Sequence, residues 1–371
     1  MKIGVPTEIK PQEYRVALMP EQVALLCKAG HSVCVQRGAG EGSGFLDKDY
    51  RSAGATIVDG AQQLFDAAEL IVKVKEPQPE ECARLRAGHV LFTYLHLAPD
   101  RALVDSLLDS GATAIAYETV RDESNRLPLL FPMSEIAGRV AAQAAARCLE
   151  KPLGGSGILL GGATGVEPAK TLILGGGVVG VNAGLILSGM GAQVTVLDSS
   201  ETKRAQLAQE WGRCFQIGAS DAATLGELLP EADVVIGAVL VPGDASPKLI
   251  RRRDLARMKS GAVLVDVAID QGGCFESSRP TTHAAPSFIE QCVVHYCVAN
   301  IPGAVPRTAT AALSRATFPY IQALADKGWK AAMQADPGLA SGLSVCGGRL
   351  VCPAVARAQA RPFVELESVL A

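Results

Sequence analysis

The segment from Thr171 to Asp198 constrains the fold of this chain more than any other part of its sequence. An apolar run at Thr171–Leu174 leads directly into glycines with the spacing G-x-G-x-x-G, and a helical pattern follows over Val181–Ser188. A second apolar run then ends at Asp198, 23 residues after Gly175. This order of strand, glycine turn, helix and strand with a terminal acidic residue is typical of a dinucleotide-binding βαβ unit.

A G-x-G-x-x-G match alone is weak evidence, because a chain with 38 glycines contains many ordinary turns. Its position between a strand and a helix favours dinucleotide binding. In such units the first glycine makes the tight turn, the second lets the backbone approach the pyrophosphate, and the third permits close packing of helix and strand. The helix N-terminus adds partial positive charge. We therefore expect cofactor contacts at Gly175, Gly177, Val178, Val179 and Gly180.

Asp198 predicts which nicotinamide dinucleotide is used. A carboxylate accepts a hydrogen bond from a free ribose 2′-hydroxyl, whereas it repels a 2′-phosphate unless a basic group compensates. Two serines and Glu201 follow Asp198 without an adjacent basic residue, and Lys203 and Arg204 come one helical turn later. The sequence therefore favours NAD over NADP, with Lys203 and Arg204 as the groups that leave the alternative open.

The composition indicates a globular protein with two domains. The 371 residues are 48% hydrophobic, and one domain usually holds roughly 100 to 200 residues. Lys and Arg number 35 against 38 Asp and Glu, so no surplus of positive charge attracts nucleic acid. Charged residues interrupt each apolar run before the roughly 18 to 20 residues that a membrane-spanning helix needs.

The ten cysteines and the start of the chain favour a cytoplasmic location. No Cys-x-x-Cys pair and no Cys/His cluster with metal-ligand spacing occurs, so we expect buried free thiols and no metal site. The chain opens with Met1-Lys2-Ile3 and continues into a strand, without the basic and apolar regions of a signal peptide. Both features fit a reducing compartment.

Apolar runs bounded by glycine or proline alternate with helical patterns along the chain, which is typical of α/β folds. Met133–Leu149 predicts a connecting helix with Ser134 as its N-cap, and Thr308–Lys327 predicts another long helix. The expected strands are Lys2–Val5, Ser32–Gln36, Leu70–Val74, His89–Leu95 and Thr113–Tyr117 in a first series, and Thr171–Leu174, Gln193–Leu197, Asp233–Val239, Ala262–Val267 and His295–Val298 in a second.

These two series predict two Rossmann-like domains, each with a doubly wound parallel sheet. The residues after the last long helix are too few for a domain of their own, so they should return to the first one. We expect a discontinuous substrate domain, residues 1–130 and 306–371, and a NAD-binding domain, residues 131–305.

Three polar residues follow strands of the first domain. Arg15 lies in the loop after the first strand, Lys75 follows the strand that ends at Val74, and His96 follows the strand that ends at Leu95. In open α/β sheets, ligands bind outside the carboxyl ends of the strands, so these loops can form one site. Each residue by itself is more often a solvated or structural side chain.

Six short blocks of sequence resemble a known family. They are Val5–Lys10 with Arg15–Ala17, Lys73–Pro77, Tyr94–Leu97, Ala116–Thr119, Pro132–Glu135 and Ala268–Gly273. Together they closely resemble NAD-dependent alanine dehydrogenases, and the resemblance runs essentially from end to end. Some blocks are shared with the NAD-binding subunit of proton-translocating nicotinamide nucleotide transhydrogenase. The Tyr-Leu-His block and Asp270 are more specific to the amino-acid enzymes.

The resemblance implies a role for each polar candidate. Arg15 and Lys75 match the family positions that bind the substrate carboxylate and carbonyl oxygen, and His96 and Asp270 match the acid-base residues. A guanidinium suits bidentate binding of a carboxylate, and an imidazole suits proton transfer near neutral pH. Asp270 follows a strand of the second domain, so the resemblance implies a site that is assembled by domain closure.

The resemblance also extends the expected cofactor site. Gly162-Ala163-Thr164-Gly165 replaces the expected Gly-Val-Pro-Gly, and Asn300-Ile301-Pro302 replaces the commoner Asn-Met-Pro, but neither departure removes a candidate catalytic group. The further expected cofactor contacts are Met133, Ser134, Asp198, Lys203, Ser220, Val239, Leu240, Ile269, Asp270, Asn300 and Ile301.

The leading hypothesis is the reversible NAD-dependent oxidative deamination of L-alanine to pyruvate and ammonia. A first alternative is a transhydrogenase-type subunit that passes hydride between two nicotinamides, which would need a membrane partner and has no use for His96. A second is a catalytically silent nucleotide-binding protein, which should have lost at least one of the four polar residues. The choice of alanine over glycine or serine, and assembly into a homohexamer, are implied by the resemblance alone.

Overall fold

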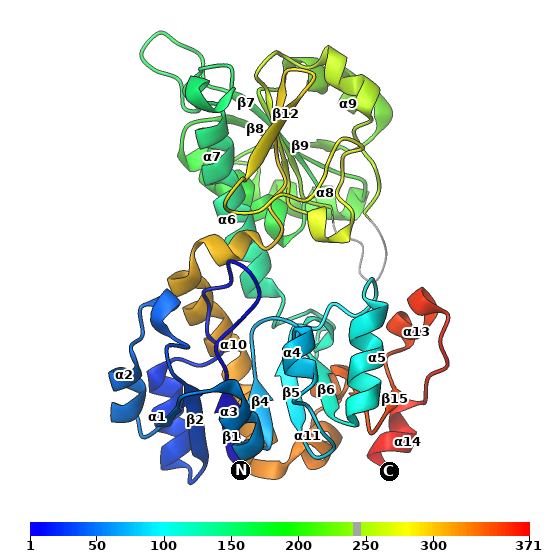
Figure 1. Cartoon of the computed structure of the whole chain (residues 1–371). Coiled ribbons are helices and arrows are strands. Elements are labelled where there is room, and N and C mark those ends of the chain that lie inside the picture. The colour runs from blue at the N-terminus through cyan, green and yellow to red at the C-terminus, as the bar shows by residue number, and fades with distance from the viewer. Residues whose placement is uncertain (240–245) are drawn as a thin grey trace. The chain divides into compact units, whose positions relative to one another are not determined.

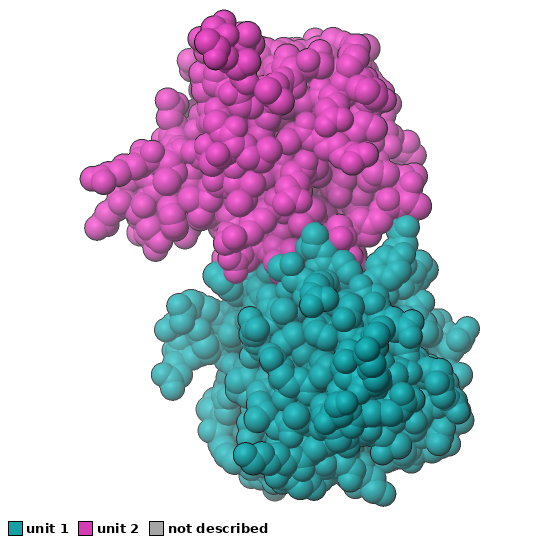
Figure 2. All heavy atoms as spheres, turned by 90° about the vertical axis from the view of Figure 1, so that its left-hand side faces the viewer, with its two compact units in different colours: residues 1–133, 305–371 teal, residues 134–304 magenta. Residues whose placement is uncertain are grey.

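A computed structural model describes residues 1–239 and 246–371. The chain divides into two compact units, residues 1–133 with 305–371 and residues 134–304 (Figure 2). The boundaries expected from the sequence are 130/131 and 305/306, and those of the compact units are 133/134 and 304/305. Each unit is an open sheet flanked by helices, so the predicted α/β class with two Rossmann-like units is confirmed.

The sheet of the first unit has the strand order β15-β14-β6-β5-β4-β1-β2-β3 (Figure 1). The six strands from β6 to β3 are parallel, whereas β14 is antiparallel to β6 and to β15. The strands are β1 (Lys2–Val5), β2 (Ser32–Gln36), β3 (Thr56–Val58), β4 (Leu70–Val72), β5 (Val90–Thr93), β6 (Thr113–Ala116), β14 (Leu343–Cys346) and β15 (Arg349–Leu350).

The sheet of the second unit has the order β12-β13-β11-β10-β7-β8-β9, and all of it is parallel except for the edge strand β12. The order reverses direction at β7, where the glycine turn follows. The strands are β7 (Lys170–Leu174), β8 (Gln193–Asp198), β9 (Gln216–Ala219), β10 (Val234–Gly237), β11 (Val263–Asp266), β12 (Ser287–Glu290) and β13 (Val293–Tyr296).

The helices of the first unit connect its parallel strands and include the C-terminal segment. They are α1 (Pro20–Lys28), α2 (Asp47–Ser52), α3 (Ala61–Ala67), α4 (Pro79–Cys82), α5 (Arg101–Ser110), α10 (Pro306–Lys327), α11 (Trp329–Ala335), α12 (Pro337–Ala340), α13 (Pro353–Gln359) and α14 (Leu366–Leu370). The second unit contains α7 (Val178–Gly189), α8 (Glu201–Trp211) and α9 (Ala222–Leu228), and the unit boundary falls inside α6 (Phe131–Cys148).

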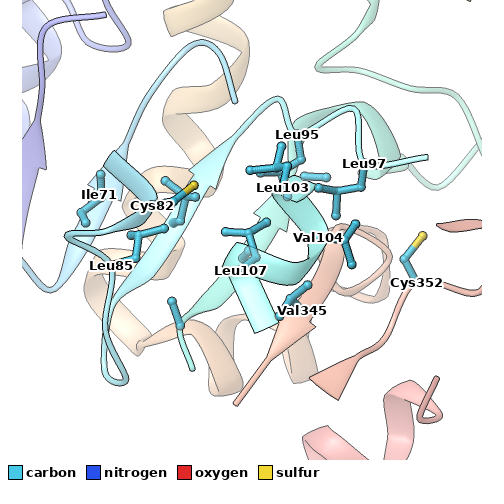
Figure 3. Packing of buried hydrophobic residues seen from close by; sticks show 14 of the residues in the cluster. Ile71, Cys82, Leu85, Leu95, Leu97, Leu103, Val104, Leu107, Val345 and Cys352 are labelled. Carbon is cyan, nitrogen blue, oxygen red and sulfur yellow. The ribbon is translucent and has the colours of Figure 1, made fainter. Parts of the chain in front are cut away.

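The C-terminal residues belong to the core of the first unit. Figure 3 shows Leu103, Val104 and Leu107 of α5 packed in one buried cluster with Val345 of β14 and with Cys352. These α5 residues follow the three- and four-residue spacing that places side chains on one helix face. Burial of this face places residues from both sequence segments of the first unit in a single core.

Several details differ from the sequence-based expectations. Helix α6 begins at Phe131, so Ser134 lies inside the helix and is not its N-cap. The strands β3, β9, β12, β14 and β15 were not among those expected. Buried thiols are expected, but Cys214 and Cys292 are exposed and Cys27 and Cys34 are half-buried; all ten cysteines are free. In the described part of the chain, no helix combines the length and the apolar character required to cross a membrane.

Candidate active site

The turn between β7 and α7 can be built only with glycine at two positions. Gly175 has φ +106°, and its N–H donates to the Leu197 carbonyl oxygen at 2.8 Å. A Cβ on Gly175 would lie 2.8 Å from the carbonyl oxygen of Ala238, and one on Gly180 would lie 1.9 Å from the carbonyl oxygen of Gly175. The first and third glycines of the motif therefore allow the tight turn and the close packing expected of them.

The second glycine of the motif differs from these two. A Cβ on Gly177 would meet no heavy atom within 4 Å, so it would point into open space at the start of α7. No side chain caps this helix at its N-terminus. The N–H groups of the first turn, beginning at Val178 and Val179, are therefore suited to an anion such as a pyrophosphate.

Asp198 lies beside this turn. Its Oδ2 accepts a hydrogen bond from Gly176 N at 2.9 Å, and its Oδ1 accepts one from Ser200 N at 2.9 Å. The Arg204 guanidinium donates to the backbone oxygens of Asp198 and Ser199, at 2.8 and 3.0 Å. The side chain of Arg204 is thus engaged with the backbone, while the half-buried carboxylate of Asp198 retains acceptor capacity for a ribose.

The other predicted cofactor residues of the second unit lie at or after strand ends. Ser220 follows β9 and donates its N–H to the Asp198 carbonyl oxygen at 3.1 Å, and Lys203 lies in the first turn of α8. Val239 follows β10, while Leu240 lies outside the described residues. Ile269 and Ile301 are buried, and Asn300 has φ +68°.

Arg15 is buried in the first unit, with 2% of its surface exposed. Its Nε donates to Glu13 Oε1 at 2.6 Å, and its Nη1 lies 3.1 Å from the sulfur of Met133. Burial opposes the charge, but the hydrogen bond and the negative charge of Glu13 raise the pKa of Arg15 above its ordinary value. The guanidinium is therefore a fixed cation, as carboxylate binding requires.

Lys75 is also buried, just after β4. Its carbonyl oxygen accepts a hydrogen bond from the Thr93 hydroxyl at 2.8 Å. Burial opposes ionisation of the neighbouring Glu76, but the positive charges of Lys75 and Lys10 lower the pKa of Glu76 below its ordinary value. Lys75 thus lies in a polar part of the site where its ammonium group already stabilises a carboxylate.

A buried ionic triad supports the strand end that carries Lys75. Lys73 Nζ lies 3.0 Å from Glu8 Oε2 and 2.7 Å from Glu81 Oε1, and Lys73 is 1% exposed. Glu8 also accepts the N–H of Val74 at 2.7 Å. Burial would lower the pKa of Lys73, but the charges of Glu8 and Glu81 raise it, so the ammonium form is favoured. The triad therefore fixes the backbone next to Lys75.

His96 follows β5 and is exposed, with its backbone in the left-handed region at φ +48°. Glu118 accepts the N–H of His96 at 2.6 Å, and the imidazole stacks on the ring of Tyr94 with 5.7 Å between centroids. Tyr94 in turn donates its hydroxyl to the Leu129 carbonyl oxygen at 2.5 Å, and burial raises the pKa of the Tyr94 phenol. Glu118 thus holds the backbone of His96, and Tyr94 contacts one face of its imidazole ring.

The three polar candidates of the first unit gather at one edge of its sheet. The N–H of Tyr94 donates to the Val74 carbonyl oxygen at 3.3 Å. Lys75 comes one residue after Val74 and His96 two residues after Tyr94, so both follow neighbouring strands at the same end of the sheet. The charge of Arg15 also acts on the Tyr94 phenol. Tyr94 thus stacks on His96 and is also subject to the charge of Arg15.

Asp270 belongs to the second unit. It lies in the short 3-10 helix Ile269–Gln271, which follows the carboxyl end of β11, and its side chain is exposed. The described residues contain no group of three or more His, Cys, Asp or Glu side chains that could hold a metal ion. Arg15, Lys75, His96 and Asp270 offer two cations that can bind a carboxylate or a carbonyl oxygen, and an imidazole and a carboxylate that can transfer protons.

Four residues that support the candidate site are absent from the sequence-based expectations, although all of them lie in or beside the blocks that resemble the family: Glu8, Glu13, Tyr94 and Glu118. Glu118 follows β6 at the same sheet edge as His96, so the strand-end criterion would have included it. Glu13 lies two residues before Arg15, and this short spacing places both on one loop. The contact between Glu8 and Lys73 joins residues 65 positions apart and has no local signal.

Two protein-family models match most of the chain. Residues 4–137 match the model described as alanine dehydrogenase/PNT, N-terminal domain, and residues 141–353 match the corresponding C-terminal domain. The chain belongs to the alanine dehydrogenase/PNT family. The resemblance inferred from the short blocks is therefore confirmed.

Individual relatives are similar to this chain over their full length. The chain is 55% identical to the alanine dehydrogenase of Halomonas elongata over 370 residues and 52% identical to that of Mycobacterium tuberculosis strain H37Rv over 371 residues, covering 100% of both chains in each case. A solved L-alanine dehydrogenase structure superposes with a TM-score of 0.92 at 47% identity, with 100% of both chains covered. A transhydrogenase structure from Sinorhizobium meliloti is more distant, with a TM-score of 0.81 at 26% identity over 95% of this chain and 100% of that one.

Proposed function

We propose that this chain is an alanine dehydrogenase, an oxidoreductase that converts L-alanine, water and NAD reversibly into pyruvate, ammonium, NADH and a proton. The observation that carries the proposal is the 47 to 55% identity to alanine dehydrogenases over essentially the whole chain. The presence of Arg15, Lys75, His96 and Asp270, to which the resemblance assigns the substrate-binding and acid-base roles, supports the same reaction.

The dinucleotide site of the second unit fits a nicotinamide cofactor, which the family implies. The glycine turn accepts no Cβ at Gly175 or Gly180, and the open backbone at Gly177 with the uncapped start of α7 would hold the pyrophosphate. Asp198 would accept a hydrogen bond from the adenosine ribose. A bound nicotinamide ring would supply the acceptor for the hydride that leaves the substrate Cα.

We infer NAD rather than NADP because of the charge at the end of β8. Asp198 places a carboxylate where a 2′-phosphate would have to lie, and the nearby Arg204 guanidinium is held by two backbone oxygens. A carboxylate and a phosphate repel each other unless a cation lies between them. Lys203, Ser220, Val239, Leu240, Ile269, Asn300 and Ile301 complete the proposed cofactor site, with Met133 and Ser134 at the nicotinamide.

Arg15 and Lys75 are the proposed substrate-binding residues. The buried guanidinium of Arg15, fixed by Glu13, would bind the carboxylate of alanine or pyruvate. Lys75, held by the backbone contacts of β4 and β5, would bind the carbonyl oxygen of pyruvate. A cation at each oxygen-bearing group fixes the 2-oxo acid in one orientation.

His96 and Asp270 are the proposed acid-base residues. Removal of hydride from Cα of alanine leaves an iminium group, to which water must add before ammonia leaves. The water gives up a proton when it attacks, and the departing nitrogen takes one up. An imidazole and a carboxylate can hold these protons in turn.

The roles of the two units follow from these assignments. We propose that residues 1–130 and 306–371 form the substrate domain and residues 131–305 the NAD-binding domain. We further propose a cytoplasmic enzyme that assembles into a homo-oligomer, with six copies as the family resemblance implies. Size-exclusion chromatography with light scattering tests the assembly directly.

A direct assay tests the function. Purified protein is mixed with NAD and one small amino acid at a time, and NADH formation is followed at its absorbance maximum. L-alanine should give the highest kcat/KM, with glycine and L-serine lower, and the reverse amination should prefer pyruvate to glyoxylate. Reduction of a second nicotinamide nucleotide by NADH, without any amino acid, would instead indicate the transhydrogenase reaction.

A further inference from the structure

Asp266, the last residue of β11, is a buried charged group to which the proposed reaction gives no role. None of its surface is exposed. Its carboxylate accepts hydrogen bonds from the backbone N–H groups of Ala268 at 3.2 Å, Cys274 at 2.9 Å and Phe275 at 3.3 Å. The hydroxyl of Ser278 donates to the same carboxylate. Four donors therefore converge on one side chain.

These donors lie on both sides of Asp270 in the sequence. Ala268 precedes the 3-10 helix that carries Asp270, and Cys274 and Phe275 follow it, so the carboxylate of Asp266 closes residues 268–275 into a loop. The N–H of Gly273 also donates to the Ala268 carbonyl oxygen at 3.0 Å. A Cβ on Gly273 would lie 2.5 Å from Asp266 Oδ2, so the loop approaches the carboxylate as closely as glycine allows.

Lys248 holds the same loop through its carbonyl groups. Its Nζ donates to the carbonyl oxygens of Gly272, of Gly273 at 2.8 Å and of Phe275 at 3.3 Å. The N–H groups of the loop are thus held by a negative side chain and its carbonyl groups by a positive one. The exposed residue Asp270 lies in the loop whose backbone Asp266 and Lys248 hold.

The burial of Asp266 is costly, which indicates that the loop geometry matters. Burial raises the pKa of Asp266, although its hydrogen bonds oppose the shift. Taking a carboxylate out of water costs several kcal/mol, and only a complete set of donors offsets this. An ordinary surface loop does not need such an anchor, whereas a proton-transfer group must be placed to within about 0.5 Å.

We propose that Asp266 is a positioning residue for Asp270: its buried carboxylate fixes the backbone of residues 268–275 and so holds Asp270 in one position. The inference rests on the proposed function, because it presupposes that Asp270 takes part in proton transfer. It predicts that a change at Asp266 lowers the turnover number through Asp270, without contact between Asp266 and the substrate.

The test variant is Asp266→Asn, which has nearly the same shape. The carboxamide retains one acceptor oxygen but turns an NH₂ group toward the backbone N–H donors. Because a misplacement of about 1 Å can cost about 100-fold in rate, kcat for L-alanine should fall by roughly 10- to 100-fold, while KM for L-alanine and the Kd for NAD change by less than about threefold.

A matched control is Asp233→Asn in the same unit. Asp233 is also buried, accepts the N–H of Lys170 at 2.8 Å and pairs with Lys259 Nζ at 2.8 Å. It precedes the amino end of β10, whereas residues 268–275 follow the carboxyl end of β11, the parallel neighbour of β10. This variant should lose thermal stability with kcat within about twofold of wild type. Equal losses of kcat in both variants would show a general structural effect and overturn the proposal.

Two further measurements separate positioning from folding. In an Asp270→Asn background, Asp266→Asn should lower the residual kcat by less than about threefold, because the group that it positions is already absent. The full 10- to 100-fold loss in that background would overturn the proposal. If Asp266→Asn does not fold, Ser278→Ala removes one donor and should give a smaller loss of kcat that likewise disappears with Asp270→Asn.

Hydrogen exchange provides a readout that does not depend on activity. The amides of residues 267–276 should exchange faster in Asp266→Asn than in Asp233→Asn. Unchanged exchange, or faster exchange with normal kcat, would overturn the proposal. A wild-type protein that does not oxidise L-alanine would refute the proposed function itself, and the exchange experiment would still decide whether Asp266 fixes the loop.

Discussion

The carboxylate of Glu118 accepts a hydrogen bond from the backbone N–H of His96, with 2.6 Å between Oε1 and N. The same carboxylate accepts the N–H of Leu95 at 3.2 Å. His96 has φ +48°, in the left-handed region that residues other than glycine rarely occupy. Glu118 therefore holds the proposed acid-base residue in a conformation that its own backbone disfavours.

Glu118→Gln should lower kcat for L-alanine about tenfold, because the neutral carboxamide is a weaker acceptor for the N–H groups of Leu95 and His96 than the carboxylate, whose charged hydrogen bonds are worth about 1.5 to 3 kcal/mol. The Kd for NAD should not change. Asp336→Asn serves as the control, since Asp336 also accepts a backbone N–H, that of Leu339 at 3.0 Å, at the start of α12. Steady-state kinetics of both variants decide the question, and full activity of Glu118→Gln would contradict the account.

Asp198→Ala should weaken NAD binding and narrow the preference for NAD over NADP. The variant loses the carboxylate that would bind the ribose and repel a 2′-phosphate, and a charge-assisted hydrogen bond of about 1.5 to 3 kcal/mol corresponds to roughly 10- to 100-fold in affinity. Measurement of KM for both cofactors checks this. Equal use of NAD and NADP by the wild type would show that Asp198 does not select the cofactor.

Arg15→Ala and Lys75→Ala should each reduce kcat/KM for pyruvate by orders of magnitude, since loss of a charged contact to an anionic substrate costs about 2 to 5 kcal/mol. NAD should still bind. Arg15→Lys should recover only part of the loss, because it keeps the charge but not the paired donors. Normal pyruvate kinetics in either alanine variant would remove that residue from the substrate site.

Stability should depend on pH through His295. Burial lowers the pKa of this histidine, which is fully buried and lies 2.8 Å from the Ser277 hydroxyl. Because the folded pKa lies below the unfolded value of about 6.5, the unfolded chain binds a proton first as the pH falls. The contribution of neutral His295 is complete above about pH 6.5 and is lost as the pH falls toward the folded pKa, by up to about 1.4 kcal/mol per pH unit.

Urea unfolding at about pH 7.5 and about pH 5.5 measures this effect, with His295→Gln as the variant that cannot titrate. The free energy of unfolding should decrease more between the two pH values in the wild type than in the variant. An identical decrease in both proteins would mean that another group dominates.

The parts of the fold with a strong local pattern were predictable from the sequence. Lys2–Val5 and Ser32–Gln36 are continuous apolar or alternating runs, and both form the expected strands. The glycines after Leu174 could also be interpreted from the sequence, because a side chain at Gly175 or Gly180 would collide with the backbone of the turn. The three-residue strand Thr56–Val58 and the edge strand Ser287–Glu290 have no such pattern, because one is short and the other is partly exposed.

In the candidate site, too, some residues could be predicted from the sequence and others could not. Arg15, Lys75 and His96 follow predictable strands, so the edge at which they gather could be inferred from sequence order. The groups that fix them could not, because Glu118 and His96 are 22 residues apart and Glu8 and Lys73 are 65 apart. Contacts of this kind depend on the order of strands in the sheet, which local patterns do not determine.

The most direct test of the account is NADH formation by the purified wild-type protein with L-alanine, compared with the same assay on His96→Ala and Asp270→Asn. The account predicts a wild-type reaction that favours L-alanine over glycine and L-serine. It also predicts a loss of about 10²- to 10⁴-fold in kcat for both variants, with NAD binding retained. No NADH formation by the wild type, or wild-type rates in both variants, would contradict it.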